Sequence, residues 1–257
     1  MPTLHELASF LDSTLDIEGV PDYSNAVNGV QVANFGAING VATAVDFSTE
    51  SVNGAINSGA RLLLVHHGMF WGGVQPLTGH RHSRLWALLT HDVAVYSAHL
   101  PLDVHSEFGN NALLVKRLGL EANGGFAKYK TIDVGLCGSS NIPTRLLAER
   151  AAALAEEFGG RLVATPFSGE RLTRKWGVCT GAGADSETLR EAAEKGLDTL
   201  IVGEGPHHTA VEARELGIAV LYAGHYATET LGVRALGEVL AQRFKISSIF
   251  VDIPTGL

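Results

Sequence analysis

Apolar side chains recur at two different spacings along this chain, and each spacing predicts its own kind of element. Near the start, leucines lie three or four residues apart, at Leu4, Leu7, Leu11 and Leu15. This spacing marks one face of a helix, and Thr3 with Glu6 forms the capping-box pattern that begins one. In residues 41–47 the larger side chains stand at every second position, which predicts a strand.

Short apolar runs make up most of the remaining pattern, and helical patterns separate them. Leu62–Val65 is such a run, and its length suits a strand buried on both faces of a parallel sheet. The predicted strands are 28–32, 41–47, 62–65, 93–96, 132–136, 176–180, 200–202, 218–222 and 246–253. The predicted helices are 49–58, one around 85–89, 112–118, 143–158, 185–195, 207–216 and one that begins near residue 226. This alternation of strands and helices predicts an α/β fold.

One part of the pattern repeats. Residues 49–67 can be laid over residues 186–204 without a gap, each reading as a helix, a glycine and a strand that ends in polar groups. This repeat predicts two related α/β lobes; the alternative is that any two helix–glycine–strand units look alike, because such units share composition. The stretch Asn123-Gly124-Gly125 is the best boundary, and the last helix and strand are expected to fold back onto the first lobe. The predicted ranges are 1–124 plus 226–257 for the first lobe and 125–225 for the second.

Composition excludes several classes of protein. Of 257 residues, 19 are Lys or Arg and 27 are Asp or Glu, which gives a net charge of −8. A chain this acidic is expected to be a poor generic binder of nucleic acid or of membrane surfaces. No apolar run approaches the ~20 residues of a membrane span, and no secretory signal is visible. Cys137 and Cys179 lie in apolar strands and form no CxxC, so we expect buried packing in a reducing cytoplasm.

Histidines and carboxylates stand directly after several predicted strands. In open α/β sheets, ligands bind outside the carboxyl ends of the strands. The residues placed there are His66, His67, His99, Asp103, Glu204, His225 and Glu229. Imidazole and carboxylate without thiolate suit Zn, Fe, Mn, Co or Ni, so we predict a metal site in which His99 is a ligand, a supporting residue or a proton carrier.

Spacing supports this prediction. His225 and Glu229 are four residues apart and share a face if a helix begins there. His66 and His67 can converge on one site only if their strand ends there, which Gly68 permits; otherwise they face two metals.

His5, His80, His82, His91 and His105 lack a partner pattern, and His207 and His208 remain ambiguous. Gly181–Gly183 resembles a phosphate-binding turn, but a tight turn before a helix capped by Ser or Asp explains it better.

Four stretches identify a family resemblance: Asn28–Val32, Val65–Trp71, His99–Asp103 running to Gly109-Asn110-Asn111, and Ala223–Glu229. Together they resemble the Nif-three-like proteins, also called the GTP cyclohydrolase I type 2 family, in the short bacterial form without an inserted domain. The resemblance implies two α/β lobes with a metal cleft between them at the strand C-terminal ends. It also implies a homohexameric ring and two divalent metal ions per chain.

The family's metal ligands fall on His66, His67, Asp103, His225 and Glu229, with Glu229 bridging both ions. The expected function is then a metal-dependent hydrolase of a small molecule. In the family's reaction, a metal hydroxide attacks the purine ring of GTP and formate is released, with His99 or Glu204 carrying protons. Two alternatives stay open at this point: a metal-dependent nucleotide phosphoesterase, and a non-catalytic metal-binding regulator.

Overall fold

Two sheets organise the chain in the computed structural model, which describes residues 1–257, and each sheet belongs to its own compact unit. The first unit contains Met1–Leu102 and Gly232–Ile253, and the second contains Asp103–Leu231 and Pro254–Leu257. Two helices have residues in both units: α4 (Leu100–Asp103) and α9 (His225–Phe244). None of the helices combines the length and the hydropathy that a membrane span requires.

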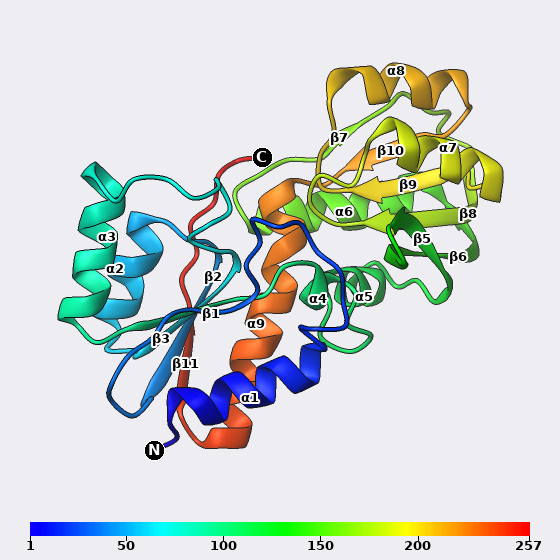
Figure 1. Ribbon diagram of the computed structural model, residues 1–257. Coiled ribbons are helices and arrows are strands. Elements are labelled where there is room, and N and C mark those ends of the chain that lie inside the picture. The colour runs from blue at the N-terminus through cyan, green and yellow to red at the C-terminus, as the bar shows by residue number, and fades with distance from the viewer. The chain divides into compact units, whose positions relative to one another are not determined.

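The first unit is a sheet covered by helices on both faces (Figure 1). Its strand order is β1-β4-β3-β2-β11, and all neighbours are parallel except the β1–β4 pair. Its elements are α1 (Leu4–Leu15), β1 (Gly29–Val32), β2 (Gly40–Asp46), α2 (Thr49–Asn57), β3 (Leu62–His67), α3 (Gly79–Thr90), β4 (Ala94–Ser97) and β11 (Ser247–Phe250). Because β3 is central and buried along its whole length, polar groups at its end are held on a rigid support.

The first helix begins as the sequence predicts. The capping box of Thr3 and Glu6 is confirmed, since the Thr3 side chain accepts from the Glu6 N–H and the Glu6 carboxylate accepts from Thr3 N. The last strand also folds back as expected, because Ser247–Phe250 pairs with β2 at the edge of this sheet.

The second unit is a six-stranded mixed sheet with the order β5-β6-β8-β9-β10-β7. Strands β8, β9 and β10 run parallel, and helices α7 and α8 pack over one face (Figure 1). Its elements are α5 (Asn110–Arg117), β5 (Ala122–Tyr129), β6 (Ile132–Pro143), α6 (Thr144–Glu157), β7 (Val163–Ala164), β8 (Leu172–Cys179), α7 (Ser186–Lys195), β9 (Thr199–Val202), α8 (His207–Glu215) and β10 (Ala219–Tyr222).

The division of the chain differs from the ranges expected from the sequence. Residues 103–124, 226–231 and 254–257 group with the second unit, whereas the sequence placed them in the first. The Asn123-Gly124-Gly125 stretch is a strand and not a linker, because it pairs with β6, where Gly125 lies opposite Leu136. A side chain at Gly125 would overlap the carboxylate of Asp133. Glycine is therefore needed there for close packing.

Candidate metal centre

Two adjacent histidines close the central strand of the first sheet. His66 and His67 are the last residues of β3 and are 0% and 7% exposed. Their ring centroids lie only 4.7 Å apart. Successive side chains of a regular strand point to opposite faces, so this closeness shows that the alternation ends here. A side chain at the next position, Gly68, would overlap the amide of Gln31, so glycine also keeps this turn compact.

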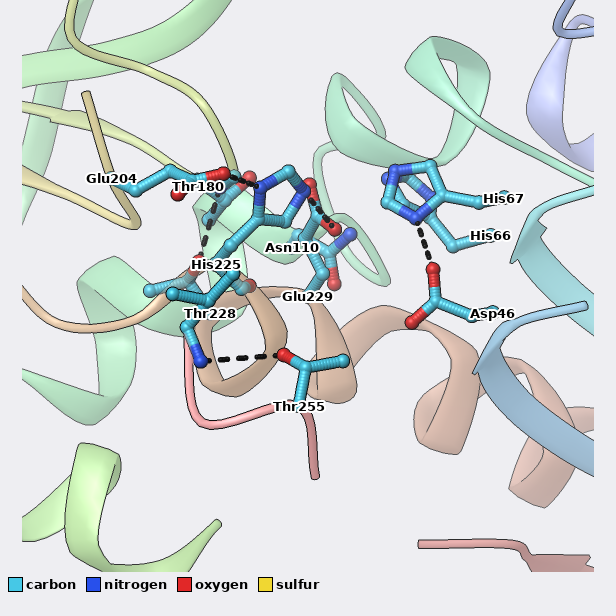
Figure 2. Close-up of polar contacts among 12 residues, drawn as sticks. Asp46, His66, His67, Asn110, Thr180, Glu204, His225, Thr228, Glu229 and Thr255 are labelled. Carbon is cyan, nitrogen blue, oxygen red and sulfur yellow. Dashed lines mark hydrogen bonds and ion pairs between the residues drawn. The ribbon is translucent and has the colours of Figure 1, made fainter. Parts of the chain in front are cut away.

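Each of three histidines in the first unit has its Nδ1 against an oxygen. His66 Nδ1 lies 2.9 Å from the Ala98 carbonyl oxygen, and His67 Nδ1 lies 2.9 Å from Asp46 Oδ1. Figure 2 shows the second contact, which sheet register explains because Asp46 and His67 are paired residues of β2 and β3. His99 Nδ1 lies 2.8 Å from Asp22 Oδ1.

This arrangement decides which ring nitrogen can bind an ion. A carbonyl oxygen only accepts, and so does an ionised carboxylate, so Nδ1 carries the proton and Nε2 carries the lone pair. Histidines that bind metals in proteins are oriented in this way by a carbonyl or a carboxylate. The potential ligand atoms of His66, His67 and His99 all lie within 4.8 Å of one another. These buried histidines therefore have the chemistry to hold a metal ion.

A small network around Asp22 holds His99 in place. Asn28 donates to Asp22 Oδ2 at 2.8 Å, and its own Oδ1 accepts from the His99 backbone N–H at 2.8 Å. Burial by itself raises the pKa of Asp22, but the hydrogen bond and charge of His99, helped by Asn28 and the Tyr23 N–H, outweigh burial and lower it. Asp22 is thus ionised at neutral pH and fixes the tautomer of His99.

Sequence reasoning missed the supporting residues of the first unit. Asn28 and Gln31 belong to a stretch that carried the family resemblance, yet no role could be assigned to them. Gln31 Oε1 accepts from the Met69 N–H at 2.6 Å and so holds the loop that follows the two histidines. The Trp71 ring in the same loop lies 4.9 Å from the His67 ring and 4.4 Å from the His99 ring, between centroids. The sequence signal for Trp71 was its position in the stretch Val65–Trp71, which carried the family resemblance.

The second unit presents a histidine between two carboxylates. His225 begins α9, and Glu229 follows one turn later with Oε2 3.0 Å from His225 Nε2. On the other side of the ring, His225 Nδ1 lies 2.7 Å from Glu204 Oε1, which follows β9 (Figure 2). Burial alone would lower the pKa of His225, but the hydrogen bonds and charges of Glu229 and Glu204 outweigh it and raise the pKa to about 9.

Asp103 is the second buried carboxylate of this unit, at 4% exposure. Asn110 donates to Asp103 Oδ1 at 2.8 Å. The neighbouring Asn111 donates to the Asp103 and Val134 carbonyls and accepts from the Thr180 N–H at 3.0 Å, which ties the start of α5 to β6 and to the end of β8. Asn110 and Asn111 therefore position Asp103, a role the sequence did not reveal.

The turn at Gly181 lies against the Glu229 carboxylate. A Cβ at Gly181 would overlap Glu229 Oε1, and the residue has a φ of +63°, which favours glycine. The Gly181 N–H donates to Thr228 Oγ1 at 3.0 Å. The turn then leads into α7, whose N-cap is Asp185, as the sequence predicted. The glycine thus allows the backbone to approach an acidic side chain.

The remaining histidines and the cysteines lie in ordinary surroundings. His105 accepts from the N–H groups of Glu107 and Phe108 and stacks on the Phe108 ring. Burial raises the pKa of Cys179 and of Cys137, so neither thiol is an activated nucleophile. The other histidines are exposed: His5, His80, His82, His91, His207 and His208.

The fold and these side chains define a class of protein: two α/β units that present buried histidines and carboxylates after their parallel strands. The sequence matches the family described as Duf34/NIF3 (NGG1p interacting factor 3) over residues 2–255. The chain belongs to this family, as the resemblance indicated.

Relatives cover the chain from end to end. A protein of Pyrococcus abyssi is 41% identical over 252 residues, 98% of each chain, and one of Treponema pallidum is 37% identical, covering 99% of this chain and 100% of its own. Both are named GTP cyclohydrolase 1 type 2 homolog. Among solved structures, ybgI, described as of unknown function, has a TM-score of 0.88 and 32% identity and covers 99% of this chain and 100% of its own. TTHA1606 from Thermus thermophilus has a TM-score of 0.82 and 32% identity, covering 98% and 99%.

Proposed function

We propose that this chain is a hydrolase dependent on two divalent metal ions. The ligands would be His66, His67, Asp103, His225 and Glu229, with Glu229 shared by both ions. One observation carries the proposal: every histidine among them has its Nδ1 against an oxygen atom. This contact keeps the proton on Nδ1 and directs Nε2 toward an ion when the ring is neutral.

Charge supports a ligand set that combines imidazoles with carboxylates. The first unit offers imidazoles, which are neutral when they bind a metal and leave the charge of a divalent ion uncompensated. The second unit supplies two buried carboxylates, Asp103 and Glu229. Carboxylate and imidazole together suit Zn, Fe, Mn, Co or Ni. A Cβ at Gly181 would overlap the Glu229 carboxylate, so glycine at this position leaves room for that carboxylate.

The proposed substrate is GTP, and the proposed reaction is hydrolytic opening of its purine ring with release of formate. The names of the full-length relatives support this choice. Bound divalent ions would act as Lewis acids toward the substrate and would lower the pKa of water. His99 is the candidate proton carrier, because Asp22 fixes its Nδ1 proton and leaves Nε2 to accept another. Glu204 orients His225 and, with its side chain 42% exposed, can also exchange a proton with solvent.

The test combines metal content with formate release from GTP. Glu229→Ala is expected to lose both metals and all formate, because it removes the shared ligand. His99→Ala is expected to keep the metals and lose turnover. Glu238→Ala is the matched control, since it removes an exposed carboxylate from the same helix. Full metal occupancy in Glu229→Ala would contradict the shared role of Glu229.

The same preparation separates the alternatives. Metals in place without formate would remove the GTP ring-opening reaction, and nucleotide phosphoesters would be assayed next, because two-metal sites favour phosphoryl displacement equally well. Silence in both assays would favour a metal-binding regulator without turnover.

A further inference from the structure

A cavity of about 200 Å³ lies beside His67 within the first unit. The residues that line it include two aromatic ones, Phe47 and Trp71, and two cationic ones, Arg81 and Arg84. A cavity that joins a candidate metal ligand, flat apolar surfaces and cationic groups has the composition of a small-molecule site.

The two arginines stand on one face at the start of α3. They are three residues apart, so their side chains lie side by side on the helix. The first turn of α3 contains no acidic residue, and Thr78, its N-cap, makes no side-chain capping hydrogen bond. The partial positive charge of the helix N-terminus therefore adds to that of the two guanidinium groups.

Arg84 is held in a fixed orientation toward this cavity. Its guanidinium carbon lies 4.9 Å from the centre of the Phe47 ring, and Nη1 donates to the Phe47 carbonyl at 3.1 Å. Its Nε is buried and has no hydrogen-bond acceptor. Burial lowers the pKa of Arg84, and the charge of Arg81 lowers it further. Two like charges are thus held together beside the cavity.

The nearby acids do not neutralise this pair. Asp46 also lines the cavity and accepts from His67, and its single negative charge offsets only one of the two guanidinium charges. Glu50 lies on α2 and is exposed. Its charge acts to raise the pKa of Arg84, but burial and the charge of Arg81 lower this pKa more. Glu50 and Arg84 form no ion pair. Arg81 makes no side-chain hydrogen bond or ion pair. The lining therefore carries a net positive charge and suits an anion.

We propose that this cavity binds a phosphate group of the substrate, with Arg81 and Arg84 as the phosphate-binding residues beside His67. Guanidinium groups match phosphate oxygens in charge and geometry. Trp71, which also lines the cavity, provides an aromatic surface for a flat part of the ligand. The inference rests on the proposed metal-dependent function and adds the place where a phosphate group of its substrate binds.

Binding measured by calorimetry on the metal-loaded protein tests this inference without relying on turnover. The probes are GTP, inorganic phosphate and guanosine, and metal content is checked for every variant. Arg81→Gln is the decisive variant, because its side chain supports no contact of the fold. We expect it to weaken binding of GTP or inorganic phosphate about tenfold or more, as loss of a charge-assisted hydrogen bond implies. Guanosine, which has no phosphate, should bind the variant and the wild type alike.

Controls separate phosphate binding from general charge and from folding. Arg190→Gln removes an exposed charge from α7 and should leave all affinities unchanged. Arg84→Gln should weaken phosphate binding as Arg81→Gln does, and its melting temperature shows whether loss of the Phe47 contact disturbs the fold.

The inference would be overturned if Arg81→Gln bound GTP and inorganic phosphate as tightly as the wild type does. It would also be overturned if the wild type bound neither of these two probes. Arginine-dependent GTP binding without formate release would leave the phosphate site standing and remove only the proposed reaction.

Discussion

At the scale of single residues, His225 links metal binding to pH. Its pKa of about 9 in the metal-free protein means that the ring is protonated at neutral pH, because Glu229 and Glu204 stabilise the charged form. A metal ion binds only the neutral ring, so the proton must leave. Metal affinity should therefore rise as the pH increases toward 9 and flatten above it.

Calorimetry in two buffers of different ionisation enthalpy measures this proton directly. We expect about one proton released per chain at pH 7.5 from this residue. In His225→Gln, which carries no titrating ring, that release, counted per metal ion bound, should disappear. Heats that are independent of the buffer in the wild type would rule out a protonated His225.

The raised pKa of His225 also sets the direction in which the stability of the metal-free protein changes with pH. Because the folded-state pKa lies above the ordinary value of 6.5, the contribution of His225 is complete below pH 6.5. It is lost as the pH rises through about 9. Unfolding by urea at pH 6 and pH 10, compared between wild type and His225→Gln, measures this loss.

Gly181 makes a second prediction at this scale. Gly181→Ala should lose metal, because the new Cβ would displace the Glu229 carboxylate. Gly217→Ala is the matched control, since Gly217 has a similar φ of +70° but no atom within 4 Å of an added Cβ. Both variants should lose about 1–2 kcal/mol of stability from backbone strain. Equal metal content in the two variants would contradict the prediction.

The sequence predicted the candidate ligands but not the residues that orient them. His66, His67 and His225 could be proposed as ligands because each ends or follows a strand, and position after a strand is a local property. Asp22 meets His99 across 77 residues of chain, and Asn28 meets it across 71. No local pattern marks such pairs, because they exist only once the strands have been assembled.

At the scale of elements, the start of α7 gives a prediction about capping. The Asp185 side chain accepts from the Thr188 N–H at 2.7 Å. Asp185→Ala should destabilise the protein by about 1 kcal/mol, because this N–H loses its acceptor. Asp185→Asn should cost much less, since the amide oxygen can replace the carboxylate. Urea unfolding of both variants decides the point, and equal losses would show that charge, and not capping, is what matters there.

Elements with a strong apolar pattern could be predicted, and elements that depend on pairing could not. The buried run of β3 was evident from its side chains. Strand β5 contains Asn123, Gly124 and Gly125, residue types that are poor in strands, and it forms because β6 pairs with it. The two-residue β7 and the single turn of α4 are too short to leave a pattern.

At the scale of the whole molecule, the predicted internal repeat has a counterpart in topology. Each unit contains three consecutive parallel strands joined by two helices: β2-α2-β3-α3-β4 in the first and β8-α7-β9-α8-β10 in the second. The repeated stretch is the middle of each series, α2–β3 and α7–β9. Whether the two superpose in detail remains a prediction.

Weakening the edge strand β11 tests whether the sheets of the two units open independently of each other. The Val251 N–H donates to the Thr43 carbonyl at 2.8 Å, just beyond the paired residues. Val251→Pro should remove this bond and speed hydrogen exchange in residues 40–46, whereas Val251→Ala keeps the N–H and controls for the lost side chain. Exchange in residues 172–179 should stay unchanged. Faster exchange there as well would show that both sheets open together.

The late position of β11 in the chain has a consequence for biosynthesis. A ribosome makes residues 40–46 early, yet one edge of that strand stays unpaired until residues 247–250 leave the exit tunnel. Every strand of the other sheet has by then been made, since the last of them ends at Tyr222. The first sheet to be synthesised is thus the last to be completed. During that interval the nascent chain exposes an open strand edge, the kind of surface that invites aggregation and binds chaperones.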